Sequence, residues 1–171
     1  MEELMGLGPQ FVLLGTGKEK YNLLFENLNK KYPQQLAVKI AFDNALAHKI
    51  EAGADIFLMP SRYEPCGLNQ IYSLKYGTVP IVRATGGLDD TIQDFDPERD
   101  EGNGFKFKEY SVPALRNAIQ RALQAYRDSA VWEKLMLRGM SADFSWGRSA
   151  AEYLNVYQET LNRRKNSTSE R

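Results

Sequence analysis

Residues 61–70, SRYEPCGLNQ, place a carboxylate beside the expected start of a helix. The segment follows an apolar run at 55–59, which has the length and bulk of a buried strand, and precedes a helical pattern that Gly77 closes. The first amides of a helix lack partners and lie at the positive end of its dipole, so they can bind an anion. Gly67, where the helix opens, lets a phosphate approach the backbone. Glu64 is not needed by a site that only binds an anion, and it therefore indicates further chemistry.

Three groups of residues in loops after expected strands fit a nucleotide diphosphate. In an open parallel sheet, ligands bind beyond the carboxyl ends of the strands. Helix-start amides can bind phosphate, a glycine loop lets the backbone approach a ligand, and an aromatic ring at a strand end can stack on a base. In that order, the residues are Gly67, Leu68 and Asn69, then Thr85, Gly86 and Gly87, and finally Phe42.

Each of these residues also has an ordinary structural interpretation. Phe42 could pack in the core, which is the better interpretation of an apolar residue at a strand end from sequence alone. Gly86 and Gly87 could form only a turn, and Glu64 could only complement the helix dipole. Cys66 is predicted to be a small buried residue rather than a nucleophile, because no histidine lies near it in the sequence.

The remaining candidates favour structural roles. His48, the only histidine, lies inside a predicted helix and is predicted to be structural. Asp94 and Asp96 resemble the carboxylate pair with which some sugar transferases bind a metal, but the acidic loop 94–101 around them favours a solvated surface connection. The sequence has no P-loop, no GxGxxG and no zinc-ligand spacing. By themselves the residues therefore indicate a phosphate-binding α/β domain.

Composition narrows the class of protein without giving a function. The 171 residues are enough for one domain with a core, and 22 basic residues balance 22 acidic ones. This balance gives no indication of a nucleic-acid or anionic-membrane partner. A single cysteine excludes an internal disulfide and fits a reducing compartment. No apolar run approaches about 18 residues, so neither a membrane span nor a signal peptide is expected.

The elements that position these residues alternate between strand and helix. Strands are expected at 11–14, 36–42, 55–59 and 78–82, and helices at 21–31, 43–50, 68–76 and 88–93. This order predicts a Rossmann-like α/β fold, with a parallel sheet and helices on both faces. Three C-terminal helices are expected at 111–126, 131–137 and 146–161, followed by a polar, disordered tail at 162–171.

The motifs resemble those of the bacterial and plant glycogen (starch) synthases that use ADP-glucose. The unbroken EPCGLNQ at 64–70, with TGGLDDT at 85–91, is highly specific for this family. Further matches are FVLLGTG at 11–17, AHKI at 47–50, YGTVP at 76–80 and MSADFSW at 140–146. The resemblance therefore covers nearly the whole chain, up to about residue 160.

The resemblance implies the second, donor-binding domain of a two-domain GT-B enzyme, here residues 1–161. It places Glu64 beside the transferred glucose with Cys66 close to it, and turns the amides of residues 67–69 toward the donor. It also implies that Phe42, where the family usually has tyrosine, stacks on adenine. Residues 85–87 match a second backbone loop near the phosphates and the sugar. Transfer to an α-1,4-glucan with retention, without a metal cofactor, is expected.

Two departures limit this expectation. The family has a lysine-containing glycine loop in its first domain and an Arg…Lys pair before the strand at 11–14, and this sequence has neither. We therefore expect the isolated chain to be inactive and the absent N-terminal domain to be its partner, packed against part of helix 146–161. The alternatives are a GT-B transferase of another nucleotide sugar and a noncatalytic nucleotide- or glucan-binding module. A bacterial cytoplasm or a plastid stroma is the expected location.

Overall fold

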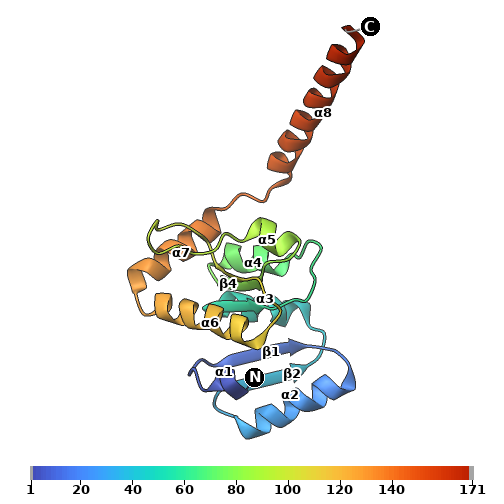
Figure 1. Ribbon diagram of the computed structural model, residues 1–171. Coiled ribbons are helices and arrows are strands. Elements are labelled where there is room, and N and C mark those ends of the chain that lie inside the picture. Colours follow the sequence, from blue (N-terminus) through green and yellow to red (C-terminus); the bar gives the residue numbers. More distant parts are fainter. Residues whose placement is uncertain (1, 170–171) are drawn as a thin grey trace. The chain divides into compact units, whose positions relative to one another are not determined.

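The computed structural model describes residues 2–169, and the chain divides into two units after Met140 (Figure 1). Strands and helices alternate in the first unit, as the sequence predicted. The strands are β1 (Phe11–Gly15), β2 (Leu36–Ile40), β3 (Ile56–Met59), β4 (Val79–Arg83) and β5 (Phe105–Phe107). The helices are α1 (Glu2–Met5), α2 (Glu19–Lys31), α3 (Asn44–Gly53), α4 (Asn69–Tyr76), α5 (Gly87–Thr91), α6 (Val112–Tyr126), α7 (Ser129–Ser141) and α8 (Trp146–Ser169).

All strand pairs are parallel, which confirms the predicted α/β fold class, but the hydrogen bonds form two sheets rather than one. β1 pairs with β2, and β4 lies between β3 and β5. Pro80 is tolerated in the central strand because pairing with β5 begins only at Ile81, one residue later. The amide of Val79 donates to Asp55 O at 3.0 Å, on the β3 side of the strand. An amide hydrogen at position 80 would therefore point toward the β5 side, at a residue where pairing with β5 has not yet begun.

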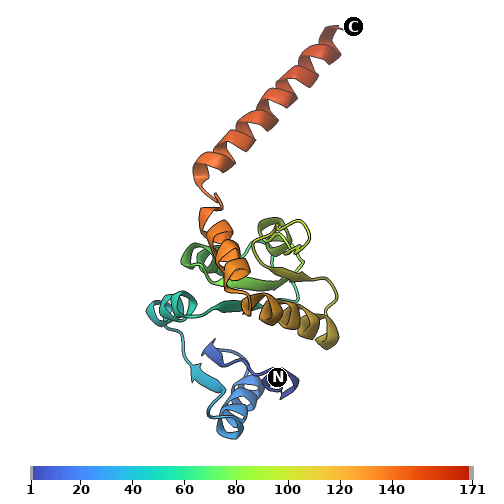
Figure 2. The same cartoon turned by 90° about the vertical axis from the view of Figure 1, so that its left-hand side faces the viewer.

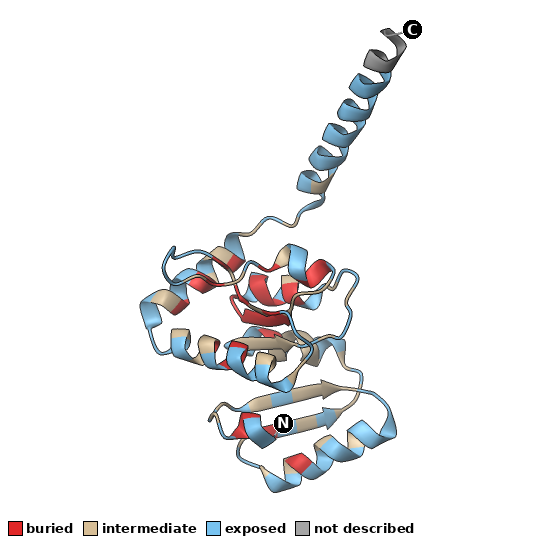
Figure 3. Ribbon diagram, viewed as in Figure 1, coloured by how far each residue is buried: buried red, intermediate tan, exposed pale blue. Residues whose placement is uncertain are grey.

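Helices cover both faces of the three-stranded sheet, with α4 and α6 on opposite sides of β4 (Figures 1 and 2). The first four residues of β4 are buried, as expected for a strand covered on both faces. Val79 and Ile81 belong to the main core cluster, together with residues of α6 and α7 (Figure 3). The layer of β1 and β2 has a smaller core of its own, formed by Met5, Leu28 and Leu36.

Strand β5 and the loop before it differ from the prediction. No strand was predicted at Phe105–Phe107, which is only three residues long. Phe105 is buried and its ring stacks on Trp132 with centroids 6.4 Å apart, a contact between residues distant in the sequence. The acidic loop is at the surface but is not a free connection. Asp94 accepts hydrogen bonds from Arg121, and Asp100 forms ion pairs with Lys134 and Arg138, both at 2.7 Å.

Several helices begin or end where capping residues in the sequence predicted. The Asp43 carboxylate accepts from the amide of Leu46 at 2.9 Å and begins α3, and the Ser111 hydroxyl accepts from the amide of Ala114 at 3.3 Å and begins α6. Gly77 ends α4 with φ of 81°, in the left-handed region that favours glycine.

The second unit consists of residues 141–169 and is described by itself. The Ser145 hydroxyl accepts from the amide of Arg148 at 3.4 Å, which confirms the predicted start of α8. The helix continues to Ser169, whereas the sequence analysis ended it at 161 and predicted disorder from 162. No glycine or proline follows Gly147, so nothing in the backbone stops it. Residues 170 and 171 of the predicted tail lie outside the described residues.

The apolar side chains of α8 are exposed. The helical spacing of apolar residues in 146–161 predicts an apolar stripe, part of which was expected to be exposed. The neighbouring Val156 and five members of the stripe are exposed: Trp146, Tyr153, Leu154, Tyr157 and Leu161. That this stripe packs on a further domain stays a prediction.

Candidate functional site

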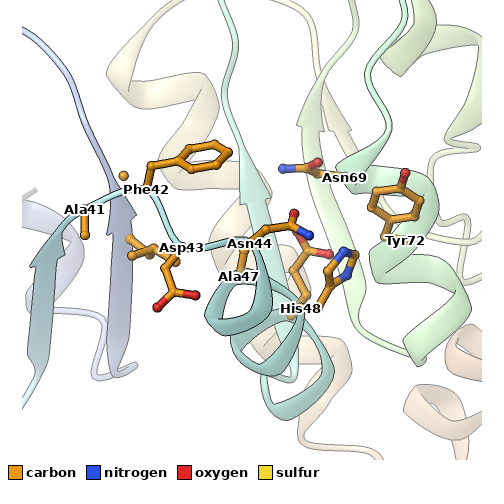
Figure 4. A pocket seen from close by; sticks show the side chains of 11 residues that line it. Ala41, Phe42, Asp43, Asn44, Ala47, His48, Asn69 and Tyr72 are labelled. Atoms are coloured by element: carbon orange, nitrogen blue, oxygen red, sulfur yellow. The ribbon is translucent and has the colours of Figure 1, made fainter.

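A pocket of about 250 Å³ lies where β1 and β2 end and α3 begins, with α4 on its other side (Figure 4). Its lining comes from the strand ends, the first three turns of α3 and the first turn of α4. The lining residues are Leu14, Gly15, Ala41, Phe42, Asp43, Asn44, Ala47, His48, Glu51, Asn69 and Tyr72.

Phe42 projects into this pocket rather than into the core. It follows β2 directly, and its residue surface is 90 % exposed. In Figure 4 its side chain extends toward that of Asn69, which belongs to the first turn of α4. The core-packing interpretation of Phe42 is therefore wrong. An exposed aromatic face at a pocket, as proposed for base stacking, is what the structure contains.

The start of α3 forms one wall of the pocket. The hydrogen bond from the Leu46 amide holds the pKa of Asp43 below its ordinary value, and Lys39, 3.5 Å away, acts in the same direction. Asp43 is therefore a carboxylate at neutral pH, which completes the cap of α3.

His48 belongs to the pocket wall and also packs against two tyrosines of α4. Its Nδ1 lies 3.2 Å from the hydroxyl of Tyr76, and its ring centroid lies 5.3 Å from that of Tyr72. These contacts join α3 to α4, which fits the structural role predicted for His48. Its position in the pocket wall was not predicted from the sequence.

Glu51 is a buried carboxylate that the sequence analysis missed. The residue is 6 % exposed, and its Oε2 has no hydrogen-bond partner among the described residues. Burial raises the pKa of Glu51 above its ordinary value, and the positive charge that His48 can carry acts weakly against this. Asn44, Ala47, His48 and Glu51 follow helical spacing along the pocket. That periodicity was the signal that could have found it.

The loop between β3 and α4 is held by one arginine. Arg83, at the end of β4, donates from Nε to Ser61 O at 2.9 Å and from Nη2 to Arg62 O. Its Nη1 also donates to Lys108 O at 3.3 Å, and its guanidinium lies over the ring of Tyr110. One planar guanidinium thus fixes three carbonyls on two loops, and two of these, those of Ser61 and Arg62, lie shortly before Glu64 in the chain.

Glu64 and Cys66 lie on this loop with different exposures. Glu64 is half-buried, and within residues 2–169 its carboxylate forms no hydrogen bond or ion pair. Cys66 is a free, exposed thiol. The prediction that Cys66 is a small buried residue is therefore wrong. The turn before α4 brings its side chain to the surface instead of into the core.

The amides of Gly67, Leu68 and Asn69 are available at the start of α4. Helix α4 begins at Asn69, with Leu68 as its cap, one residue later than the sequence suggested. In the described part of the chain, these three amides donate no hydrogen bond. Gly67 has φ of 73°, so the turn that exposes these amides favours glycine. The arrangement can bind an anion, as predicted.

The loop at Thr85, Gly86 and Gly87 contacts the Glu64 loop. The amide of Gly87 donates to Glu64 O at 3.2 Å and to Pro65 O at 3.1 Å, so it is already occupied. A Cβ on Gly86 would overlap Glu64 O, and one on Gly87 would overlap the main chain of Cys66. These glycines therefore allow two loops to touch. Their predicted contact with a donor is not needed to explain them.

The structure thus brings the predicted residues into two neighbouring groups. Phe42 and Asn69 line the pocket, while Glu64, Cys66, Gly86 and Gly87 lie on two loops joined by hydrogen bonds. Asn69 follows Gly67 and Leu68 in the chain, so the free amides connect the two groups.

Metal-ligand clusters and membrane spans were sought over residues 2–169. No group of three or more His, Cys, Asp or Glu side chains in that range could hold a metal ion. No helix in the same range is long and apolar enough to cross a membrane. Asp94, which in sequence resembles one member of a metal-binding carboxylate pair, forms an ion pair with Arg121.

Comparisons with known proteins agree with the resemblance noted in the sequence. The chain is 60 % identical over 149 residues to a glycogen synthase of Koribacter versatilis, covering 87 % of this chain and 31 % of that protein. It is 54 % identical over 166 residues to a glycogen synthase of Moorella thermoacetica, covering 96 % and 34 %. The chain therefore spans about a third of the length of the curated relatives it matches.

Solved structures give the same result and confirm the predicted fold class. The catalytic domain of starch synthase IV from Arabidopsis thaliana, bound to ADP and acarbose, matches with a TM-score of 0.81 at 36 % identity, covering 94 % of this chain and 34 % of that one. A sucrose-phosphate synthase from Thermosynechococcus elongatus matches with a TM-score of 0.64 at 27 % identity, covering 94 % and 41 %. The family model "Glycosyl transferases group 1" matches residues 3–134. The chain therefore belongs to the group 1 glycosyl transferases.

Proposed function

We propose that this chain is the donor-binding domain of a glycogen or starch synthase that uses ADP-glucose. Its similarity to glycogen synthases at up to 60 % identity supports the enzyme class. The similar starch synthase structure, which is bound to ADP and acarbose, supports the nucleotide.

The single observation that carries the proposal is the exposed Phe42 across the pocket from the start of α4. A ring that is 90 % exposed at a pocket can stack on a base. The free amides of Gly67, Leu68 and Asn69 can donate hydrogen bonds to the diphosphate at the other end of the same nucleotide. An aromatic face and an anion-binding helix start within one site match the two chemical ends of ADP.

In the proposed reaction, glucose passes with retention from ADP-glucose to the end of an α-1,4-glucan, without a metal cofactor. The leaving diphosphate gains negative charge, and preorganised amides at the start of α4 stabilise it by about 3 kcal/mol per donor. Glu64, half-buried and without a protein partner in the described residues, orients glucose hydroxyls or stabilises the cationic sugar. Cys66 lies beside it on the loop.

We infer that the chain needs a further domain to act. It spans about a third of the length of its relatives, and the cations that the family directs at the diphosphate are not in this sequence. The isolated chain is therefore expected to bind ADP weakly and to transfer no glucose.

A transferase of another nucleotide sugar is the second candidate, favoured by the structural match to sucrose-phosphate synthase. Calorimetry of this chain with ADP and with UDP, at equal concentrations, separates the two. Binding of ADP with weaker or no binding of UDP is expected. Equal binding of both nucleotides would contradict the adenine preference, and binding of neither at millimolar concentration would contradict the nucleotide site.

The catalytic role of Glu64 is tested in the full-length enzyme that contains this domain. Glu64→Gln keeps the size of the side chain and removes its charge. Incorporation of glucose into glycogen is expected to fall by about two orders of magnitude or more. Near-normal turnover would show that the carboxylate is not required, which would leave a noncatalytic nucleotide- or glucan-binding role for the loop.

A further inference from the structure

Gln70 is a fully buried polar residue beside the proposed site. The residue, in the first turn of α4, is 0 % exposed. Burying a carboxamide is costly unless it forms hydrogen bonds, so the contacts of Gln70 indicate what the burial is for. The family resemblance implies donor contacts for its neighbours in the motif, but it implies no role for Gln70.

The carboxamide nitrogen of Gln70 faces the main chain of the Glu64 loop. Nε2 lies 3.1 Å from Cys66 O, 3.1 Å from Gly67 O and 3.3 Å from the Thr91 hydroxyl oxygen. These three neighbours can all accept, so the nitrogen must occupy this position, because the carboxamide oxygen there would face carbonyl oxygens. A Cβ on Gly67 would come within 2.5 Å of Gln70 Oε1, so glycine at 67 and glutamine at 70 fit together.

Thr91 continues the chain of hydrogen bonds from Gln70 to the glycine loop. Its hydroxyl donates to Gly87 O at 2.5 Å and can therefore accept from Gln70. The amide of Gly87 in turn donates to Glu64 O and Pro65 O, at 3.2 and 3.1 Å. The hydrogen bonds close a ring: Gln70 to Thr91, Thr91 to Gly87, and Gly87 back to the loop that Gln70 itself holds.

We propose that Gln70 is a positioning residue that, through Thr91, fixes the backbone of residues 64–67 against the glycine loop. Every carbonyl from Glu64 to Gly67 accepts a hydrogen bond within this ring. Glu64 belongs to this stretch, and the free helix-start amides begin at its end. The ring thus sets the direction of the carboxylate and of the anion-binding amides without contacting a ligand itself.

The exposed thiol of Cys66, the only cysteine, gives a readout on this chain that is independent of turnover. Thr91→Val removes the hydroxyl at nearly constant volume, and Thr91→Ser keeps it. Because thiol reactivity follows its local environment, the rate of Cys66 modification by a disulfide reagent is expected to change about threefold or more in Thr91→Val and in Gln70→Met, and to stay near wild type in Thr91→Ser. Thermal unfolding of each variant verifies that it is folded.

The double variant tests whether Gln70 and Thr91 act as one unit. If they do, Gln70→Met combined with Thr91→Val changes the Cys66 rate little more than either substitution alone. Additive effects, or rates within about 1.5-fold of wild type in folded Thr91→Val, would overturn the proposal. Thr91→Val keeps this test decisive even if Gln70→Met does not fold.

The consequence for catalysis rests on the proposed function and is measured separately. In the full-length synthase, Thr91→Val is expected to lower kcat about tenfold or more, since small misplacements of catalytic groups are costly, while KM for ADP-glucose changes less. An unchanged kcat would overturn the positioning role. A changed Cys66 rate in a chain that binds no nucleotide would contradict the proposed function and leave the ring intact.

Discussion

Arg121 Nη2 donates to both carboxylate oxygens of Asp94, each at 3.0 Å. The same nitrogen donates to Phe95 O at 3.1 Å, and the guanidinium lies over the ring of Phe105. Asp94 also accepts from the amide of Lys106 at 2.7 Å. The acidic composition of loop 94–101 favoured a solvated connection, but the base of the loop is attached to α6 and β5. The carboxylate of Asp94 is already paired with Arg121.

Arg121→Met is expected to lower the free energy of unfolding by about 1–2 kcal/mol, because Asp94 and Phe95 O lose a charged donor, although partial exposure lets water replace some of it. Arg121→Lys is expected to retain only part of this free energy of unfolding, since an ammonium cannot reproduce the planar geometry of a guanidinium. Urea unfolding measures the change. The matched control is Arg99→Met, which breaks an exposed pair with Asp96 at 3.6 Å and should change stability by less than about 0.5 kcal/mol. Equal losses in the two variants would contradict an anchoring role for Arg121.

Phe42→Ala is expected to weaken ADP binding about fivefold or more, since stacking of a base on an aromatic ring contributes about 1–3 kcal/mol. Phe42→Tyr keeps the ring and should bind within about twofold of wild type. Calorimetry gives the affinities, and thermal melting verifies folding, which Phe42→Ala should leave unchanged because the side chain is exposed. Unaltered affinity in Phe42→Ala would show that the base binds elsewhere.

Gly87→Ala is expected to lower the free energy of unfolding by about 1–3 kcal/mol, because its Cβ would overlap main-chain atoms of Cys66, which cannot rotate away. Gly53→Ala is the control, since a Cβ there meets nothing within 4 Å and alanine should be neutral or stabilising by up to about 1 kcal/mol. Chemical denaturation compares the two. A neutral Gly87→Ala would mean that the two loops separate at no cost.

Glu51→Gln is expected to raise the melting temperature at pH 7 and to have less effect at pH 4. Burial raises the pKa of Glu51 in the folded chain, so the folded state binds this proton more tightly than the unfolded chain. The resulting stability is fully present below the unfolded pKa and is lost as pH rises through the folded one. Thermal melts across this range provide the measurement, with the exposed Glu98→Gln as control. A difference that grows toward acid pH would contradict this sign.

The order of elements was predictable because it depends on local signals. Asp43 and Ser111 begin helices, Gly77 ends one, and apolar runs mark β1 to β4. These interactions span a few residues, so the sequence alone contains them. Strand β5 was not predictable in this way, because three residues show no period and Phe105 owes its burial to Trp132, which is 27 positions later.

The sequence motifs singled out the residues of the candidate site, whose ligand contacts stay predictions, while the exposure of these residues was harder to predict. Motif residues Glu64, Gly67 and Asn69 lie where a ligand can reach them or the backbone must turn. Residue type suggested burial for Phe42 and Cys66, and both are exposed in the structure, whereas Glu51, for which no prediction was made, is buried. Side-chain chemistry gives an average preference, whereas a position just past a strand end or on an inward helix face decides the individual case.

The main core cluster and the smaller cluster of the β1–β2 layer are unequal in size, and this bears on how the proposed nucleotide site is held together. Phe42 follows β2, whose layer packs around Met5, Leu28 and Leu36, while the Glu64 loop connects β3 to α4 beside the larger core. Local opening is easiest where few apolar side chains are buried, so amides of β1 and β2 should exchange with deuterium faster than those of β4. A nucleotide stacked on Phe42 would have to stabilise the layer of β1 and β2, which would use part of the binding free energy. Hydrogen exchange of the β1 and β2 amides would then be slower when the nucleotide is bound. Under the proposed function, affinity at this site would then depend on local folding as well as on contact with the nucleotide.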